Sequence, residues 1–130
     1  NSNSDEGRFV YRKLVGDGEF VLQVSNFSST APSNERAGIM LRESLNVNAR
    51  ALFPHVDQDG SIQFYRRTAT GASMTTGLAD QASASWLKIV RSGDVFTAYH
   101  SNNGSSWTLF SGVNVENPVT LADMPETLYV

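Results

Sequence analysis

Apolar and polar residues alternate in short stretches along almost the whole chain, and tight-turn signals separate these stretches. In Glu19–Ser25, for example, Phe20, Leu22 and Val24 share one face of an extended chain. About nine such stretches, with almost no helical periodicity, predict an all-β domain. The predicted strands are Phe9–Leu14, Glu19–Ser25, Arg36–Arg42, Ala49–Val56, Ser61–Arg67, Trp86–Arg91, Val95–Ser101, Ser106–Ser111 and Leu128–Val130.

The turn signals favour antiparallel pairing. Gly16–Gly18, Asp57–Gly60 and Ser92–Asp94 each separate two alternating stretches, which is typical of a β-hairpin. Ser28–Asn34 is expected to be a loop, and the small, polar stretch Thr68–Ser85 a long and partly extended connection. Short strands and turns at regular spacing predict an antiparallel β-sandwich or barrel.

Length and composition fit one domain. The chain has 130 residues, and we expect a linker or processed end at residues 1–6 and a single β-sandwich domain at 7–130. The formal net charge of -3 gives no electrostatic reason to expect nucleic acid or an anionic membrane as partner. Without cysteine there are no disulfides or thiolate metal sites, and no apolar run approaches the roughly 20 residues that a membrane span needs.

The run Ala37–Leu41 is apolar enough to be a central strand of the sandwich, in which Gly38 is expected to let the facing layer approach closely. Arg42 and Glu43 follow as the polar end of this strand. Because adjacent residues of a strand point to opposite faces, these two side chains cannot easily converge on one bond. We therefore expect them to be a pair at the rim of the sheet rather than a catalytic acid and base.

Four segments carry a resemblance to a known family, and they occur in the right order and spacing. They are Ala37–Ser44 (AGIMLRES), Phe64–Arg67 (FYRR), Trp86–Gly93 (WLKIVRSG) and Thr97–Thr108 (TAYHSNNGSSWT). They resemble secreted bacterial jelly-roll domains of the concanavalin A-like lectin/glucanase superfamily, over most of the chain. The resemblance implies a non-catalytic, extracellular or cell-surface β-sandwich of the kind appended to polysaccharide-degrading enzymes and adhesins.

The chain departs from the family pattern at both ends. Family members have further strands before the equivalent of Phe9, and they continue past the equivalent of Tyr129 and Val130 with another strand. The resemblance therefore implies an open sheet edge at these ends, because either neighbouring sequence was removed or a strand from another chain completes the sheet.

Aromatic residues are the first candidates for ligand contact. Trp86 is the first residue of its strand and follows a polar loop, so we expect it either to pack against the protein or to contact a ligand. Trp107 alternates with Leu109 and is expected to pack in the core or under the hairpin. Tyr65 and Arg67 share one face of their strand, where they form either a shallow platform for a sugar or carboxylate or ordinary cross-strand pairs.

Other polar residues complete the candidate set. Arg42 and His100 are further candidates for ligand contact, although His100 has no evident partner in a nucleophile motif. Asp57 and Asp59 offer oxygen ligands at alternate positions, as at the start of a calcium loop, but a third acidic position and a bidentate glutamate are missing. A turn already explains Asp59 beside Gly60, and we expect no cofactor.

The segment Ser101–Trp107 is similar to the Asp-box hairpin of sialidases, but it is one residue shorter and has Asn in place of Asp. We expect a polar turn held by side-chain hydrogen bonds to the backbone, with a tryptophan packed beneath it. Its expected role is structural.

Three functions follow as hypotheses. The first is a non-catalytic module that binds a polysaccharide or glycan surface. The second is a structural subunit of an extracellular filament or adhesin, which assembles with copies of itself or a neighbouring chain through a sheet edge. An enzyme is the least favoured, because a glycosidase needs two carboxyl groups across a cleft and the glutamates here are isolated.

Overall fold

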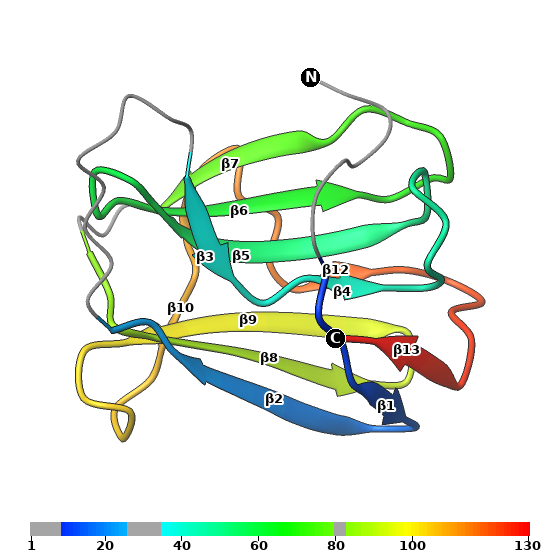
Figure 1. Ribbon diagram of the computed structural model, residues 1–130, viewed down its shortest axis with the longest axis horizontal. Coiled ribbons are helices and arrows are strands. Elements are labelled where there is room, and N and C mark those ends of the chain that lie inside the picture. Colours follow the sequence, from blue (N-terminus) through cyan, green and yellow to red (C-terminus); the bar gives the residue numbers. More distant parts are fainter. Residues whose placement is uncertain (1–8, 26–34, 80–82) are drawn as a thin grey trace.

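The structure is a computed structural model that describes residues 9–25, 35–79 and 83–130, so the linker expected at residues 1–6 and the loop Ser28–Asn34 lie outside the described residues. Within the described ranges the chain forms strands and no helix, as the sequence predicts. These ranges therefore contain no helix that could cross a membrane. Two antiparallel sheets form a β-sandwich (Figure 1). The strands are β1 (Lys13–Val15), β2 (Gly18–Gln23), β3 (Arg36–Gly38), β4 (Leu41–Arg42), β5 (Ala51–Asp57), β6 (Ile62–Arg67), β7 (Thr75–Ala79), β8 (Trp86–Ser92), β9 (Val95–Ser101), β10 (Thr108–Leu109), β11 (Gly112–Val113), β12 (Val119–Thr120) and β13 (Thr127–Tyr129).

The larger sheet, sheet A, has the order β1-β13-β4-β5-β6-β7-β11, and β3 pairs with β5 beside β4. The predicted strand Arg36–Arg42 is thus split into β3 and β4, which keep one register against β5. The break lies opposite Pro54, which has no N–H to donate, although its carbonyl still accepts from Ile39 N (3.1 Å). A proline in β5 therefore interrupts the ladder without shifting it.

Gly38 permits a close approach, but not the one expected from the sequence. A Cβ at this position would lie 2.3 Å from the carbonyl oxygen of Pro54 and 2.6 Å from Cα of His55. Both atoms belong to β5, the neighbouring strand of the same sheet. The expectation that Gly38 accommodates the facing layer was wrong, because the crowding is within sheet A.

The smaller sheet, sheet B, has the order β10-β9-β8-β2, and β12 also pairs with β9. Ala98 lies on β9 between the parts of the strand that pair with β10 and β12. The side chain of Asn117 fills this gap, because its Oδ1 accepts from Ala98 N (2.9 Å) and its Nδ2 donates to Ala98 O (2.8 Å) and Phe110 O (3.0 Å). One amide side chain thus continues the hydrogen bonding of β9 where no strand does.

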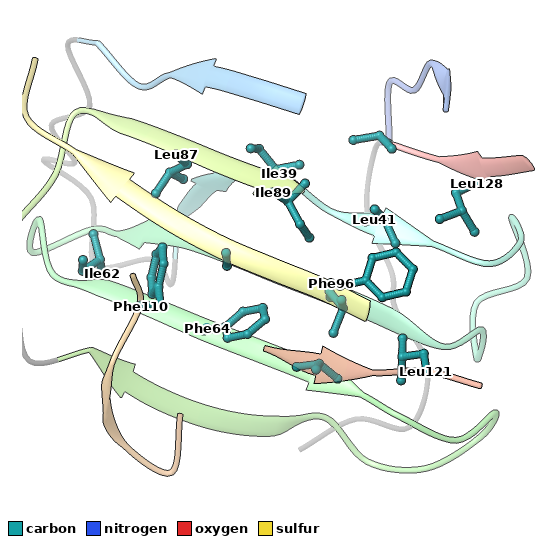
Figure 2. Packing of buried hydrophobic residues seen from close by; sticks show 14 of the residues in the cluster. Ile39, Leu41, Ile62, Phe64, Leu87, Ile89, Phe96, Phe110, Leu121 and Leu128 are labelled. Carbon is teal, nitrogen blue, oxygen red and sulfur yellow. The ribbon is translucent and has the colours of Figure 1, made fainter. Parts of the chain in front are cut away.

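The hydrophobic core lies between the two sheets, as Figure 2 shows. Alternate residues of each strand point inward, so that Ile62 and Phe64 of β6 face Leu87 and Ile89 of β8 in one continuous cluster. Burying a side chain of this size stabilises the fold by about 1.5–3 kcal/mol. The intervening residues form the outer faces of the sandwich, where a ligand can reach them.

Two of the three predicted hairpins are present. Strands β5 and β6 join across Asp57–Gly60, where Gly60 has φ +84° and its N–H donates to Asp57 O (2.9 Å). Strands β8 and β9 join across Gly93, with φ +60°. In both turns glycine takes the left-handed conformation that the sequence signal predicts.

The third predicted hairpin, at Gly16–Gly18, is wrong. Strand β1 pairs with β13 in sheet A, whereas β2 pairs with β8 in sheet B. The chain passes from one sheet to the other at Gly16 (φ +69°), and the carboxylate of Asp17 accepts from Gly93 N (2.7 Å). A corner between sheets needs the same turn residues as a hairpin, so the local sequence does not distinguish the two.

Three strands of the described residues have no counterpart among the predicted ones. Strand β7 lies inside Thr68–Ser85, where the sequence predicts a connection, and it pairs with β6 through four residue pairs, from Gln63↔Leu78 to Arg66↔Thr75. The two-residue strands β11 and β12 were also missed. Short or polar strands give too weak an alternation to be found, and they form here because a longer strand offers its edge.

The predicted open edge beside Leu128–Val130 is wrong for this part of the chain. Strand β13 lies between β1 and β4, and Val130 exchanges backbone hydrogen bonds with Arg12 (2.7 and 2.9 Å). Leu128 is fully buried in the core. The N-terminal strand returns alongside the last one, so both neighbours of β13 come from the chain itself.

Candidate functional site

Aromatic side chains gather around His55 on the outer face of sheet A. Phe53 stacks on the imidazole of His55 with ring centroids 4.4 Å apart, and Tyr65 meets it edge-on at 4.7 Å. The guanidinium of Arg36 lies 5.1 Å from the centroid of the Tyr65 ring and donates to its hydroxyl (3.4 Å). Tyr65 is partly exposed and is held in place by its cross-strand neighbours on the outer face of sheet A.

His55 is fully buried within this cluster. Its Nδ1 lies 3.0 Å from Phe53 O, while its Nε2 is buried without a hydrogen-bond partner. Burial, the largest influence, lowers the pKa of His55 from 6.5 to about 4. The hydrogen bond with the Phe53 carbonyl, the next largest influence, raises the pKa, and the smaller effects are those of the charge of Arg36, which lowers it, and of Asp57, which raises it. The imidazole is thus neutral at physiological pH and not poised for proton transfer there.

Arg42 and Arg67 both lie on the outer side of sheet A, buried against the loops that follow β4 and β6. Arg42 donates to the backbone oxygens of Ser44 and Asn46. Arg67, with no exposed surface, donates to Val47 O (3.2 Å), Ala49 O (3.1 Å) and Ala72 O (2.8 Å). Their guanidinium groups fasten loops over the sheet, so this end of the face is covered by the chain itself.

Glu43, next to Arg42, has its partners in the loop that follows β4 and in Thr70. Its carboxylate forms an ion pair with Arg50 and accepts from Arg50 N (3.1 Å) and from the Thr70 hydroxyl (3.0 Å). Burial, the largest single influence, raises the pKa of Glu43, but the hydrogen bonds from Arg50 and Thr70 and the charge of Arg50 together outweigh it and lower the pKa below its usual value. Arg42 and Glu43 thus point to opposite sides, as their adjacent positions predict, and each has partners in the loop that follows β4.

His100 lies in the core, with 5% of its surface exposed. It points inward from β9 and meets Phe110 edge-on, with ring centroids 5.3 Å apart. Burial lowers its pKa. This placement is that of a packing residue.

Asp57 and Asp59, the candidate calcium ligands, hold the turn between β5 and β6. Asp57 accepts from Gln58 N and from Gln63 Nε2, both at 2.8 Å. Asp59 accepts from Ser61 N (2.8 Å), and its hydrogen bonds from Ser61 lower its pKa. In the part of the chain that the structure describes, no three or more His, Asp or Glu side chains are grouped so that they could hold a metal ion.

The outer face of sheet B carries a second aromatic group, which we call the aromatic–lysine face: Trp86 and Lys88 of β8, Tyr99 of β9, and Trp107 just before β10. Leu87 and Ile89 point into the core, so alternation turns Trp86 and Lys88 outward. Lys88 lies directly opposite Tyr99 in the β8–β9 register. Its Nζ lies 4.8 Å from the centroid of the Tyr99 ring and 4.4 Å from that of Trp107.

All four side chains of the aromatic–lysine face are partly exposed, and none belongs to the core cluster. Trp107 therefore does not pack in the core, which is one of the two positions expected for it, and Leu109, its neighbour in alternation, is 46% exposed. The core position of this segment is taken by Phe110. Leu109 lies opposite the outward-facing Tyr99, so regular alternation places Trp107 and Leu109 on the outer face and Phe110 on the inner one.

The hairpin Ser101–Trp107 supports this face from one end. Asn103 Oδ1 accepts from Ser105 N and Ser106 N, both at 2.9 Å, and Ser101 Oγ accepts from Gly104 N (2.9 Å). The predicted polar turn held by side chains is confirmed. The tryptophan packed against it is Trp86, since a Cβ on Gly104 would lie 2.9 Å from Cε2 of its indole.

The five residues selected from the sequence do not form one site. Trp86 lies on sheet B, Tyr65, Arg42 and Arg67 on the outer side of sheet A, and His100 in the core. Sequence reasoning missed Lys88 and Tyr99. The signal was present, because the predicted hairpin across Ser92–Asp94 places these two residues opposite each other, on the face away from Leu87.

Comparisons with models of protein families, with curated proteins and with solved structures return no match for this chain. The structure itself defines the fold class, which is an all-β protein with two antiparallel sheets.

Proposed function

We propose that this chain is a non-catalytic, extracellular β-sandwich module that binds carbohydrate through the aromatic–lysine face. The observation that carries the proposal is the placement of Tyr99 and Trp107 against Lys88, with Trp86 on the same outer face and all four side chains outside the core. Membership of the concanavalin A-like jelly-roll superfamily, as the sequence motifs suggest, and a secreted bacterial origin are part of the same proposal.

The chemistry of this face suits a sugar. Aromatic rings pack against the apolar C–H faces of sugar rings, and tyrosine and tryptophan also offer a polar edge. The ammonium of Lys88 can donate three hydrogen bonds to hydroxyl groups of the ligand. Trp86 is covered on one side by Gly104, so we assign direct contact to Tyr99 and Trp107 and a supporting role to Trp86.

The polar groups away from this face favour a binding role over a catalytic one. Glu43 is engaged by Arg50 and Thr70, and both histidines are buried, each with a lowered pKa. A glycosidase would use two carboxyl groups facing each other across the bond to be broken. The side chains of the aromatic–lysine face include no carboxylate.

Affinity electrophoresis through gels that contain a panel of soluble polysaccharides tests the proposal. The wild-type chain is expected to be retarded by at least one polysaccharide, and Trp107→Ala and Tyr99→Ala to bind about tenfold or more weakly, as is usual for central aromatic contacts. Tyr11→Ala is the control, because Tyr11 is an aromatic residue with 44% of its surface exposed near β1, on sheet A. Absence of retardation across neutral and charged polysaccharides would contradict the proposal.

A second candidate function is assembly by strand addition. Sheet B ends at β2, whose six residues pair only with β8 within the described ranges. A free edge of this length can accept a strand from a copy of the chain or from a neighbouring protein. Light scattering coupled to size-exclusion chromatography is expected to show concentration-dependent oligomers, and a monomer at every concentration would rule this role out for copies of the chain alone.

A further inference from the structure

Lys88 is a partly buried cation without an acidic partner. Its ammonium lies against the rings of Tyr99 and Trp107, at 4.8 and 4.4 Å from their centroids. The ion pairs among the described residues are those of Arg50 with Glu43 and of Arg66 with Glu116, and neither includes Lys88. Aromatic rings stabilise a cation, but they accept no strong hydrogen bond, so the three N–H donors of Lys88 remain available to a ligand.

The other buried or partly buried basic residues differ from Lys88 in this respect. Arg50 and Arg66 each combine a carboxylate with backbone carbonyls, while Arg91 donates to three backbone oxygens, those of Gly93, Met124 and Glu126. These guanidinium groups serve the fold. Lys88 lies on the outer face of sheet B and, unlike these guanidinium groups, its ammonium forms no hydrogen bond or ion pair with the described residues.

The neighbours of Lys88 on the sheet leave this charge largely uncompensated. Val21 of β2 lies directly opposite it and is 40% exposed, and Val90 follows on the same face of β8. Glu19, the nearest acidic residue by register, lies opposite Val90 and forms no ion pair with Lys88 within the described residues. An ammonium among apolar side chains attracts an anion more strongly than one in bulk water, because the effective dielectric constant is lower.

We infer that the glycan bound at the aromatic–lysine face carries a negative charge attached directly to its sugar ring, as a uronate or a sulfated sugar does. This inference rests on the proposed carbohydrate-binding function. Both rings lie within 5 Å of the ammonium, so one sugar unit can pack against Tyr99 or Trp107 and place its anionic group on Lys88. Lysine binds such a group as a point charge, which tolerates either a carboxylate or a sulfate.

The test compares polymers that differ only in charge. Polygalacturonate is matched with its methyl-esterified form, and dextran sulfate with dextran, in the same affinity gels. The wild-type chain is expected to bind at least one charged polymer about tenfold or more tightly than its neutral match, which is the usual weight of a charge-assisted hydrogen bond. Which pair shows the preference identifies a carboxylate or a sulfate as the ligand group.

The chain offers a matched variant, because it has two lysines, Lys13 and Lys88. Lys88→Gln is expected to abolish the preference for the charged polymer, Lys88→Arg to retain most of it, and Lys13→Gln, with the same change of net charge on β1, to leave it intact. Thermal unfolding of each variant establishes that it is folded. Equal binding of charged and neutral polymers by the wild-type chain would overturn this inference alone, whereas absence of binding to every polymer would overturn the proposed function as well.

Discussion

Trp86 packs directly against the backbone at Gly104, since a Cβ on Gly104 would lie 2.9 Å from Cε2 and 3.0 Å from Cδ2 of the indole. Gly104 also has φ +71°, which side chains rarely adopt. Gly104 is thus required both by its backbone conformation and by the lack of space for a Cβ. Its contact with Trp86 holds the hairpin Ser101–Trp107 against the strand that carries Lys88.

Gly104→Ala is expected to lower the free energy of unfolding by about 2–3 kcal/mol, from the positive φ and from overpacking against the ring. Gly16→Ala is the matched control, because Gly16 has φ +69° and no atom within 4 Å of a Cβ. It is expected to cost only about 1 kcal/mol. Urea denaturation of both variants gives the comparison, and equal losses would show that the contact with Trp86 contributes nothing.

Acid is expected to destabilise the fold through His55. Its pKa is about 4 in the folded chain and 6.5 in the unfolded chain, so below pH 6.5 the unfolded state binds a proton that the folded state does not. The free energy of unfolding therefore falls as the pH drops from 6.5 towards 4, by up to about 3 kcal/mol, and levels off below. Above pH 6.5 both states are neutral and the effect is absent.

His55→Phe, which keeps a flat ring beside Phe53, is expected to remove most of this slope in urea denaturation between pH 7 and pH 4. The pKa of His100 is lowered by burial too, so this residue adds to the slope in the same direction. His100→Phe therefore serves as the comparison, and the double variant shows what the carboxylates contribute. An unchanged slope in His55→Phe would mean that the pKa of His55 is the same in the folded and the unfolded chain.

Arg67→Lys is expected to destabilise the chain by about 2 kcal/mol although the charge is kept. Three backbone oxygens, of Val47, Ala49 and Ala72, accept from the guanidinium of Arg67, and an ammonium on a shorter reach cannot satisfy all three. Arg12→Lys, at an exposed position, is expected to stay within about 0.5 kcal/mol of the wild type. A similar loss of stability for both variants in urea denaturation would mean that the hydrogen bonds of the Arg67 guanidinium do not stabilise the loops.

Asn117→Asp tests the side chain that bridges the gap in β9. The carboxylate can still accept from Ala98 N, but it has no donor for Ala98 O and Phe110 O. We expect a loss of about 2–3 kcal/mol at pH 7, and a smaller loss relative to the wild type at pH 4, where a protonated carboxyl can donate again. Asn102→Asp, on the exposed hairpin, is the control and is expected to change little at either pH.

The fold class followed from period and turn residues, since inward residues such as Leu87 and Ile89 alternate strictly with outward ones. Hairpins were correct where a turn glycine joins two strands of one sheet, as at Gly60 and Gly93. The same kind of signal at Gly16 marks a passage between sheets, and only the distant partners of β1 and β2 decide this. The local sequence pattern does not predict which strands pair when they are far apart in the sequence.

The candidate site was only partly predictable. Trp86 was selected, and the register that brings Tyr99 opposite Lys88 follows from the predicted hairpin. Trp107 was expected in the core or under the hairpin, but it shares the outward face with Leu109, and Phe110 occupies the inward one. Arg42 and Arg67 lie at the ends of strands and were selected as candidates for ligand contact. They donate instead to loop carbonyls, and this depends on how the loops fold back over the sheet.

Five arginines of the described chain share one kind of partner, the backbone carbonyl, and this has a consequence for the medium in which the module can work. A carbonyl oxygen gains no proton in mild acid and a guanidinium loses none at neutral pH, so these ties do not titrate. The residues are Arg42, Arg50, Arg66, Arg67 and Arg91. The loops that they fasten are therefore expected to hold their places while acidification loosens the sheet around His55.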